Sequence, residues 1–493
     1  MTGTGYAEIL RLVMPETIVV IAAFLVLAVD RFFLTQAGTR VRFTVAAAIA
    51  VVGCGGSLAR LWMAPQHAFL TEGMLVVDPL SNLVQAALLI LTILAVLLAV
   101  ESRFTEHVGE YVLLMLMATA AMMFLVSSEN VLVIFLSLEL LSLSLYVLTA
   151  FSKSSIQSAE AGVKYFLFGG MSAAFMLFGL SLLYGLSGSI SLSGIASAIG
   201  PHGLDPMLMV ALVMTVIGFG FKVAAVPFHL WAPDAYQGAP APSASLIAAG
   251  SKVASFVIFA KVLMIGFAGA EGSAAWRAYA AGYVPVVAVV AAASMVLGNL
   301  AAIAQSSLRR LLAYSAMAHA GYMLLALAAH TSESVASLIY YVFTYGLTTV
   351  GAFGVVAAVE TETGSDKLSD FNGLSRRAPL LSLCTLVFLL SLAGIPPLAG
   401  FFGKFFLFAA ALQSGMGLLW LVILAIAMSA VSLYYYLRVL KGIYVADPPA
   451  SAGPLRVPPL NLTVLCLIAL AVVLLGAAPG WLLRLIENAV SAR

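Results

Sequence analysis

Charged residues are scarce in this sequence of 493 residues: Asp, Glu, Lys and Arg make up 9% of it, and hydrophobic residues make up 63%. Soluble domains carry about 25% charged residues, so this composition excludes a soluble globular protein and indicates an integral membrane protein. The net charge is +2 and the sequence has no long basic run. Nucleic acid is therefore not expected as a partner.

Cysteine is also scarce. Cys54, Cys384 and Cys466 lie far apart in apolar stretches, with no CxxC spacing that would favour a zinc site or an iron–sulfur cluster. The sequence has no P-loop and no GxGxxG between a strand and a helix. We therefore expect no metal, no cofactor and no nucleotide in this chain.

Long hydrophobic runs, in contrast, are abundant. A membrane-spanning helix needs about 20 apolar residues, and windows of that size predict about fourteen spans. The sequence therefore predicts an all-α polytopic membrane protein, and we interpret the first span as a helix and not as a cleaved signal peptide. The predicted spans are 8–29, 41–62, 79–100, 110–127, 130–151, 160–186, 206–236, 241–266, 280–303, 308–329, 334–359, 379–412, 416–440 and 459–484.

Most Lys and Arg residues between the spans lie in loops that follow odd-numbered helices. Since basic loops stay on the cytoplasmic side, both termini are predicted to face away from the cytoplasm. The remaining basic residues must lie within the spans. They are Lys164, Lys222, Lys252, Lys261 and Lys404.

Two predicted spans are too long for one straight helix, and each is interrupted by proline: Pro227 in one, and Pro396 and Pro397 in the other. Each is the fourth span in a run of five, which predicts two inverted five-helix repeats, helices 4–8 and 9–13, around a transport site. Two unrelated proline kinks are the alternative. The chain is interpreted as one membrane domain, 1–493, with subdivisions at 1–108, 109–268, 269–442 and 443–493.

Glu139 lies near the middle of its span, where a charge costs about 3 kcal/mol or more unless it is paired or neutralised. Ser142 shares its helix face. Lys222 precedes the break at Pro227, at the carboxyl end of a half-helix that favours a positive charge. Lys404 follows Pro397, so we expect it at the amino end of the second half-helix, which disfavours one. We interpret all three charged residues as proton-transfer groups.

Lys252 and Lys261 share a span, but nine residues separate them, which places them on opposite faces about 13 Å apart along the axis. Lys252 is central and is predicted to transfer protons, whereas Lys261 is near the end of the span and is expected to snorkel to water. Lys164 is a further candidate, although an ion pair with Glu160 four residues earlier is an equally simple explanation.

His319 lies mid-span, and its ordinary pKa near 6.5 suits a proton relay between lysines. His229, after Pro227, is either a relay or a helix cap. The tyrosines of the eleventh span favour packing over a place in the path. They are Tyr340, Tyr341 and Tyr345.

Three stretches then identify a family. "FKVAAVPFHLWAPDAYQGAPAPSASLIAAGSK", "QSSLRRLLAYSAMAHAGY" and "LAGIPPLAGFFGKFFLF" strongly resemble the antiporter-like membrane subunits of respiratory complex I, the NADH:quinone oxidoreductase. The resemblance covers nearly the whole chain. The chain ends soon after the last span, without the long lateral helix of subunit L, and has Lys404 where subunit M carries glutamate. Its first span and "SLYYYLRVLKGIYV" look like subunit N.

The resemblance implies a proton-pumping module driven by redox chemistry in other subunits, which would hold FMN, the iron–sulfur clusters and the quinone. It implies that Glu139 and Lys222 form an ion pair with Lys164 nearby, that Lys252 is the central lysine and that Lys404 is the terminal lysine. The implied partners are subunits M and K, the lateral helix of subunit L and the lipid bilayer. A subunit of a multisubunit sodium/proton antiporter, which shares these motifs, is the alternative.

Overall fold

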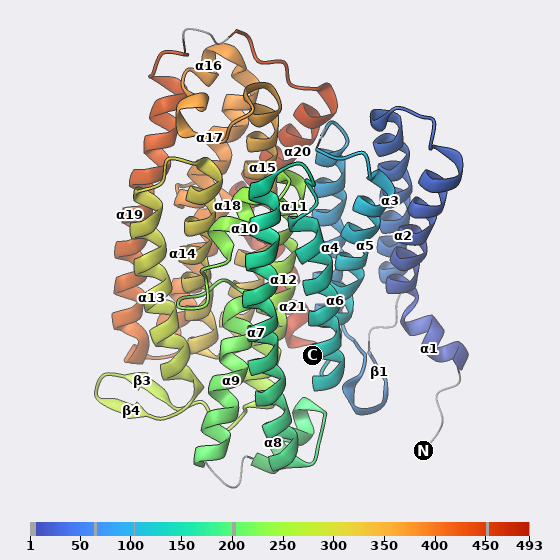
Figure 1. Cartoon of the computed structure of the whole chain (residues 1–493). Helices are drawn as coiled ribbons and strands as arrows, with labels where there is room; N and C mark the ends of the chain where they lie inside the picture. Colours follow the sequence, from blue (N-terminus) through green and yellow to red (C-terminus); the bar gives the residue numbers. More distant parts are fainter. Residues whose placement is uncertain (1–5, 64–66, 103, 200–203, 450–452, 493) are drawn as a thin grey trace.

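The chain folds into a bundle of helices, described by a computed structural model over residues 6–63, 67–102, 104–199, 204–449 and 453–492. Helices α2 and α3 form one edge of the bundle, and α13 and α19 form the opposite edge (Figure 1). The first helix, α1, and the last, α21, lie toward the lower end in that view. The all-α membrane fold predicted from the hydrophobic runs is confirmed.

The first half of the chain forms twelve α-helices among the described residues. They are α1 (Tyr6–Leu12), α2 (Met14–Phe33), α3 (Thr39–Trp62), α4 (Pro79–Ala99), α5 (Val108–Val126), α6 (Val131–Thr149), α7 (Ile156–Ser187), α8 (Leu192–Ile199), α9 (Pro206–Lys222), α10 (Ala232–Gly238), α11 (Ala241–Ala248) and α12 (Gly250–Lys261). A π-helical turn, η3 (Val262–Gly266), extends α12.

The second half adds nine α-helices within the same described ranges. They are α13 (Tyr283–Ile303), α14 (Leu308–Ala329), α15 (Ser332–Thr363), α16 (Leu374–Arg377), α17 (Pro379–Ala393), α18 (Ala399–Gln413), α19 (Leu419–Tyr444), α20 (Pro459–Ala477) and α21 (Pro479–Ser491). Two small antiparallel hairpins join helices near the lower end of Figure 1. They pair β1 (Ala68–Phe69) with β2 (Val76–Val77), and β3 (Ser273–Ala275) with β4 (Ala278–Ala280).

Eleven helices in the described part of the chain are long and apolar enough to cross a membrane. The predicted count of about fourteen also includes α2 and the two interrupted pairs, α9 with α10 and α17 with α18. The shorter apolar helices α9, α17 and α18 lie in these interrupted spans. The count and the repeat boundaries stay predictions.

The two interruptions lie where the prolines are. Pro227 is in the segment between α9 and α10, and Pro396 and Pro397 are between α17 and α18. Proline removes a backbone donor and clashes with the preceding turn, so a helix does not continue through it. At the second interruption, Gly394 caps α17 with φ +86°, a left-handed conformation that glycine adopts without strain.

The centre of the bundle is formed by α11–α12, α14 and α15. Within the chain itself, the most apolar window of α11 through η3 is 100% buried, and that of α14 is 94% buried. The outer helices α7 and α19 are 33% and 28% buried. Titratable groups on the central helices are therefore shielded from lipid by other helices.

Three predicted spans are divided further than expected. The first is broken between α1 and α2, the eighth between α11 and α12 at Ala249, and the last between α20 and α21. Pro479 explains the last break, because it begins α21 at a position that needs no backbone donor. Hydropathy reports only how apolar a stretch is, so it does not detect such changes of direction.

Candidate functional site

Lys222 is the last residue of α9 and is 7% exposed. Its Nζ donates a hydrogen bond to Ser142 Oγ on α6, and it lies 5.9 Å from the centre of the Tyr146 ring. As the sequence predicted, the residue stands at the carboxyl end of a half-helix, where the helix dipole favours a positive charge. A buried ammonium group is thus held between two helices by neutral partners.

Glu139 lies one helical turn before Ser142 on α6 and is half-buried. Its Oε1 is buried and has no hydrogen-bond partner among the described residues, and no Glu139–Lys222 ion pair forms there. The direct pair implied by the family resemblance is therefore absent from this structure. Ser142 contacts the lysine in its place, while the two charges interact over a longer distance.

Lys252 occupies the first turn of α12 and is 1% exposed. Its Nζ donates to the Ala316 carbonyl oxygen of α14 at 2.6 Å and lies 5.6 Å from the centre of the Tyr345 ring. Ala316 is three residues before His319, so Lys252 contacts the same stretch of α14 that carries the histidine. The sequence-predicted neighbours Lys252 and His319 are brought together.

His319 is 2% exposed and lies at the centre of an aromatic cluster. Its Nδ1 is 2.6 Å from the Tyr341 hydroxyl, and its Nε2 is 3.2 Å from the Tyr436 hydroxyl. The ring of Tyr345 lies 5.0 Å away and that of Tyr322 lies 5.7 Å away. Each imidazole nitrogen therefore has a hydroxyl partner that can donate or accept a proton.

Lys404 is on α18 and is 4% exposed. Its Nζ donates to the Ala393 carbonyl oxygen at 3.0 Å and to Ser429 Oγ at 2.9 Å, and lies 5.1 Å from the centre of the Tyr322 ring. Tyr322 also contacts the His319 ring, so the histidine and this lysine share a neighbour. The groups run in the order Lys252, His319, Lys404.

The prediction made for the environment of Lys404 was wrong. The sequence placed it against the amide groups of the second half-helix, but its ammonium group turns back to Ala393, the last residue of α17. It therefore faces a carbonyl oxygen at the end of α17. Lys222 is the last residue of α9, so each interrupted span has a lysine at the carboxyl end of a half-helix, where the helix dipole offsets part of the cost of burying the charge.

None of Lys222, Lys252 and Lys404 has a carboxylate at ion-pair distance within the part of the chain that the structure describes. Their partners are hydroxyl groups and backbone carbonyls. A neutral partner stabilises a charge less than a carboxylate does, so these lysines are not held permanently charged by a counter-ion. This arrangement allows a proton to leave and return.

Lys164 belongs to a different environment. Its side chain is 40% exposed and pairs with Glu160 at 2.7 Å, the alternative contact that the sequence indicated, and with Asp234 of α10 at 2.7 Å. The other oxygen of Asp234 accepts from Arg310 Nη1 at 2.6 Å. Lys164 thus helps to join α7, α10 and α14, and its part in proton transfer stays a prediction.

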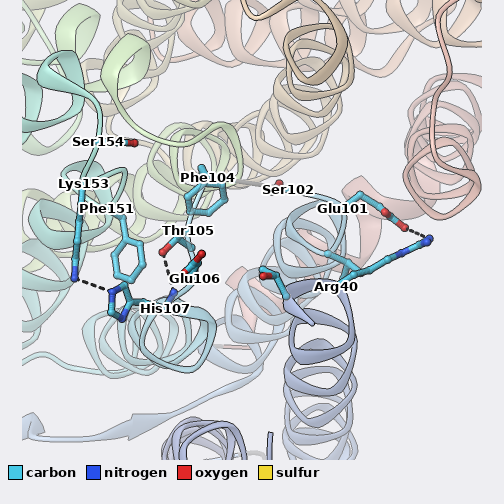
Figure 2. A pocket seen from close by; sticks show the side chains of 12 residues that line it. Arg40, Glu101, Ser102, Phe104, Thr105, Glu106, His107, Phe151, Lys153 and Ser154 are labelled. Atoms are coloured by element: carbon cyan, nitrogen blue, oxygen red, sulfur yellow. Dashed lines mark hydrogen bonds and ion pairs between the residues drawn. The ribbon is translucent and has the colours of Figure 1, made fainter. Parts of the chain in front are cut away.

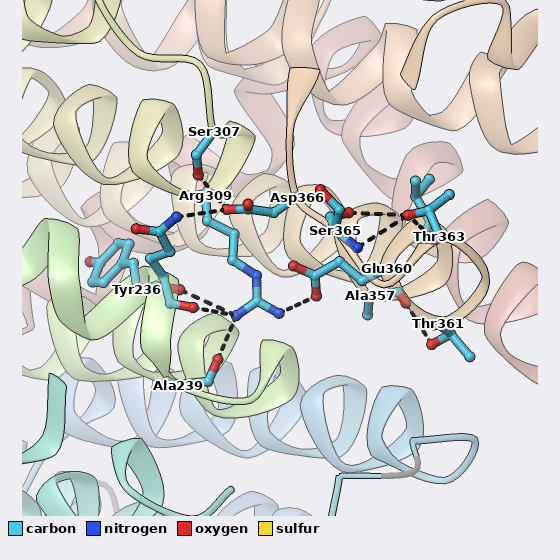
Figure 3. Close-up of polar contacts among 12 residues, drawn as sticks. Tyr236, Ala239, Ser307, Arg309, Ala357, Glu360, Thr361, Thr363, Ser365 and Asp366 are labelled. Carbon is cyan, nitrogen blue, oxygen red and sulfur yellow. Dashed lines mark hydrogen bonds and ion pairs between the residues drawn. The ribbon is translucent and has the colours of Figure 1, made fainter. Parts of the chain in front are cut away.

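Arg309 supplies a second connection at the same end of the bundle (Figure 3). Its guanidinium donates to the carbonyl oxygens of Gln237 at 3.1 Å and Ala239 at 2.5 Å, and forms an ion pair with Glu360 of α15. Arg309 was not singled out from the sequence. The structure places it at 6% exposure, where it fixes the end of α10 against α14 and α15.

Lys261 was also predicted incorrectly. It does not snorkel to water: it is 3% exposed, and its Nζ donates to the Val126 carbonyl oxygen at 2.7 Å and to Ser81 Oγ at 3.3 Å. Glu129 Oε1 lies 3.9 Å from the same nitrogen. The loop before α6 and the start of α4 cover this end of α12, which a hydropathy window does not report.

Two further groups lie close to the lysines without having been predicted. Ser429 contacts Lys404, and Tyr436 contacts both His319 and Ser315. The only indication of Tyr436 in the sequence was that it ends a run of three consecutive tyrosines, Tyr434–Tyr436, in α19. His229 is half-buried between α9 and α10 and has no contact with the lysine row in the described residues, so its role stays a prediction.

A polar cavity of about 580 Å³ lies in the loops at the upper end of Figure 1, and Figure 2 shows its lining. Arg40 pairs with Glu101 at 2.7 Å, and Lys153 Nζ is 3.1 Å from His107 Nε2. Arg40, His107 and Lys153 are exposed, Glu101 is partly buried, and the four groups contact one another in pairs, so the cavity is a surface feature. No group of three or more side chains able to hold a metal occurs in the described ranges.

Comparisons with known proteins identify the family of this chain. Residues 128–429 match the family model described as NADH:quinone oxidoreductase/Mrp antiporter, transmembrane. The chain is 56% identical, over 98% of its length and 99% of the relative, to NADH-quinone oxidoreductase subunit N 2 of Acidobacterium capsulatum. It superposes on a chain of respiratory complex I from Thermus thermophilus with a TM-score of 0.79 at 34% identity, covering 96% and 99% of the two chains.

A chain of the Mrp complex from a Dietzia species has the same fold, with a TM-score of 0.81 over 97% of each chain, but only 21% identity. That likeness concerns the fold alone, whereas the sequence identities point to one branch of the superfamily. The chain therefore belongs to the subunit N family of NADH-quinone oxidoreductase, the antiporter-like membrane subunits of respiratory complex I.

Proposed function

We propose that this subunit moves protons across the membrane along Glu139, Lys222, Lys252, His319 and Lys404, driven by redox chemistry in the other subunits of complex I. The observation that carries the proposal is the row of buried lysines with neutral partners. A buried lysine without a counter-ion can exchange its proton near neutral pH, because burial disfavours its charge. The histidine between Lys252 and Lys404 has a hydroxyl on each nitrogen.

The arrangement supports transfer in steps. Lys222 lies at the interruption between α9 and α10, and Lys404 lies beside the interruption between α17 and α18. Interrupted helices present free carbonyl groups inside the membrane, where ions are otherwise poorly solvated. FMN, iron–sulfur clusters and quinone are proposed to lie in other subunits, so this chain contributes the proton path and no redox step.

The proposed partners are subunits M and K, the lateral helix of subunit L and the lipid bilayer. Glu139 supports a protein neighbour at α6, because it is only half-buried in the isolated chain and a carboxylate facing lipid costs about 3 kcal/mol or more. The proposed location is the bacterial inner membrane with both termini in the periplasm, which the distribution of Lys and Arg supports. The lower end in Figure 1 is then the periplasmic end.

The test is NADH-driven proton uptake by membrane vesicles that contain the complex with Lys252→Met in this subunit. Methionine has a similar volume but carries no proton, so uptake should be severely lowered while the subunit stays assembled. Lys441→Met, at an exposed position near the end of α19, is the matched control and should pump normally. Normal uptake by the Lys252 variant would remove the lysine row from the path.

A further inference from the structure

A second buried basic site lies at the far end of α12, outside the row of residues described above. Lys261 is 3% exposed there, and its ammonium group is held by the Val126 carbonyl oxygen at 2.7 Å and Ser81 Oγ at 3.3 Å. Burying an ammonium group so completely is unfavourable unless the surroundings compensate or the group has a function. Its position needs an explanation beyond snorkelling.

Carboxylates gather around this lysine. Glu129 Oε1 lies 3.9 Å from Lys261 Nζ, and Glu129 immediately precedes Asn130, the N-cap of α6. Asp78, which is 1% exposed, caps α4 by accepting a hydrogen bond from the Ser81 backbone at 2.6 Å. Ser81 therefore contacts both Asp78 and Lys261. Acidic and basic side chains from the start of α4, the loop before α6 and the end of α12 thus lie close together.

A cavity of about 410 Å³ opens beside the cluster. Lys261, Glu129, Asp78 and His67 are the titratable groups that line it, and its other walls come from η3, α15 and α21. A single water needs only about 10–15 Å³ of such volume, so the cavity can hold a chain of waters. It lies near the lower end of the bundle in Figure 1, where β1 and the start of α6 lie.

The same helix connects this cluster to the lysine row. Lys252 and Lys261 are about 13 Å apart along α12, which is too far for direct transfer. Ser255 lies between them, is 0% exposed, and its Oγ has no hydrogen-bond partner in the ranges that the structure describes. Buried hydroxyl groups are nearly always bonded, to water if not to protein. Ser255 therefore offers a buried hydroxyl group, between the two lysines along the helix axis, that can bond to water.

We propose that Lys261, with Glu129 and Asp78, is a proton-transfer site that connects Lys252 to the cavity at the lower end of the bundle. The proposal rests on the proton path of the proposed function and extends it by one branch. In each step an N–H bond of the Lys261 ammonium breaks and an O–H bond forms on a carboxylate or water, leaving a neutral amine. A proton from the direction of Lys252 then restores the ammonium.

The test compares Lys261→Met, Lys261→Arg and the exposed control Lys441→Met in the complete complex, each in vesicles driven by NADH. Arginine keeps the charge and the hydrogen bonds but does not deprotonate in a protein. Both Lys261 variants should lower the rate of proton uptake about tenfold. A fully positioned acid–base group contributes ~100-fold. The expected loss is smaller because water in the cavity can replace part of the function of the lysine. Lys441→Met should be unchanged.

The outcomes separate a proton carrier from a fixed charge. If Lys261→Arg pumps normally while Lys261→Met does not, the lysine is a structural charge and the inference is overturned; normal pumping by both variants also overturns it. If the Met variant fails to assemble, the Arg variant decides in the same way. Loss of pumping in Lys252→Met with normal pumping in both Lys261 variants would leave the proposed function intact and reject only this branch.

Discussion

At the scale of single residues, the site depends on which neutral group each buried lysine contacts. Lys222 bonds to a serine hydroxyl, Lys252 bonds to a backbone carbonyl, and Lys404 bonds to one of each. A backbone carbonyl cannot be removed by mutation, but a serine hydroxyl can. Ser142 is therefore a position at which the environment of a path lysine can be changed without changing the lysine.

Ser142→Ala should lower proton uptake moderately, whereas Lys222→Ala should abolish it. Loss of the hydroxyl leaves the Lys222 ammonium without this acceptor, a penalty of about 1–3 kcal/mol on its charged form. Ser144→Ala is the matched control, since Ser144 is also buried on α6 but bonds to the Leu140 carbonyl of its own helix. Equal rates in Ser142→Ala and the control would place the Ser142 contact outside the path.

His319→Gln should also impair pumping. Glutamine can donate and accept hydrogen bonds toward Tyr341 and Tyr436, but it does not take up a proton near neutral pH. Tyr340→Phe serves as the control, because the Tyr340 hydroxyl bonds to the Leu475 carbonyl and not to the histidine. Proton uptake and NADH oxidation would be measured together, and a glutamine variant that pumps like the parent would show that His319 has only a packing role.

At the scale of helices, close approach between α17 and α18 places Lys404. A Cβ atom on Gly400 would lie 1.9 Å from the Ser391 carbonyl oxygen, so Gly400→Ala must push the two half-helices apart. We expect a loss of about 1–3 kcal/mol in stability. Gly170→Ala on α7, where nothing lies within 4 Å, should instead be neutral or stabilising by up to about 1 kcal/mol.

Thermal unfolding of the purified complex in detergent measures this difference. A lower midpoint for Gly400→Ala, with an unchanged or higher midpoint for Gly170→Ala, is the expected result. Equal midpoints would mean that the interruption between α17 and α18 adjusts without strain. Lys404 would then not depend on the close approach of these two helices.

The ion pair between Arg309 and Glu360 fixes α14 to α15 near the end of α10. Arg309→Leu leaves a largely buried carboxylate without its partner, and breaking such a pair costs about 3–5 kcal/mol. The double variant Arg309→Leu with Glu360→Leu should recover part of that loss, because no charge is then stranded. The same unfolding measurement checks this, and a single variant as stable as the parent would contradict it.

Some of these elements were predictable from sequence, and others were not. Runs of apolar residues located the spans, and isolated charges within them identified Lys222, Lys252, Lys404 and His319 as buried groups. Their partners depend on how helices pack. Lys404 turns back to Ala393 because the chain reverses between α17 and α18, and Lys261 is covered by residues distant in sequence. Neither contact has a signal within its own span.

At the scale of the whole molecule, the buried groups form a path only if the central helices exclude lipid and bulk water. The helices α11–α12, α14 and α15 are almost entirely enclosed by the others. They carry Lys252, His319 and Tyr341, which contacts the histidine, while Tyr436 reaches it from the outer helix α19. The middle of the proposed path therefore lies in the part of the bundle that is most enclosed by other helices.

The central claim is that the buried lysines carry protons by gaining and losing them, and Lys252→Arg tests it most directly. Arginine keeps the positive charge beside the Ala316 carbonyl but does not release its proton. The measurement is proton uptake relative to NADH oxidation in vesicles that contain the assembled complex. The account predicts that the Arg variant fails as severely as Lys252→Met; an Arg variant that pumps normally would show that Lys252 acts only as a fixed charge.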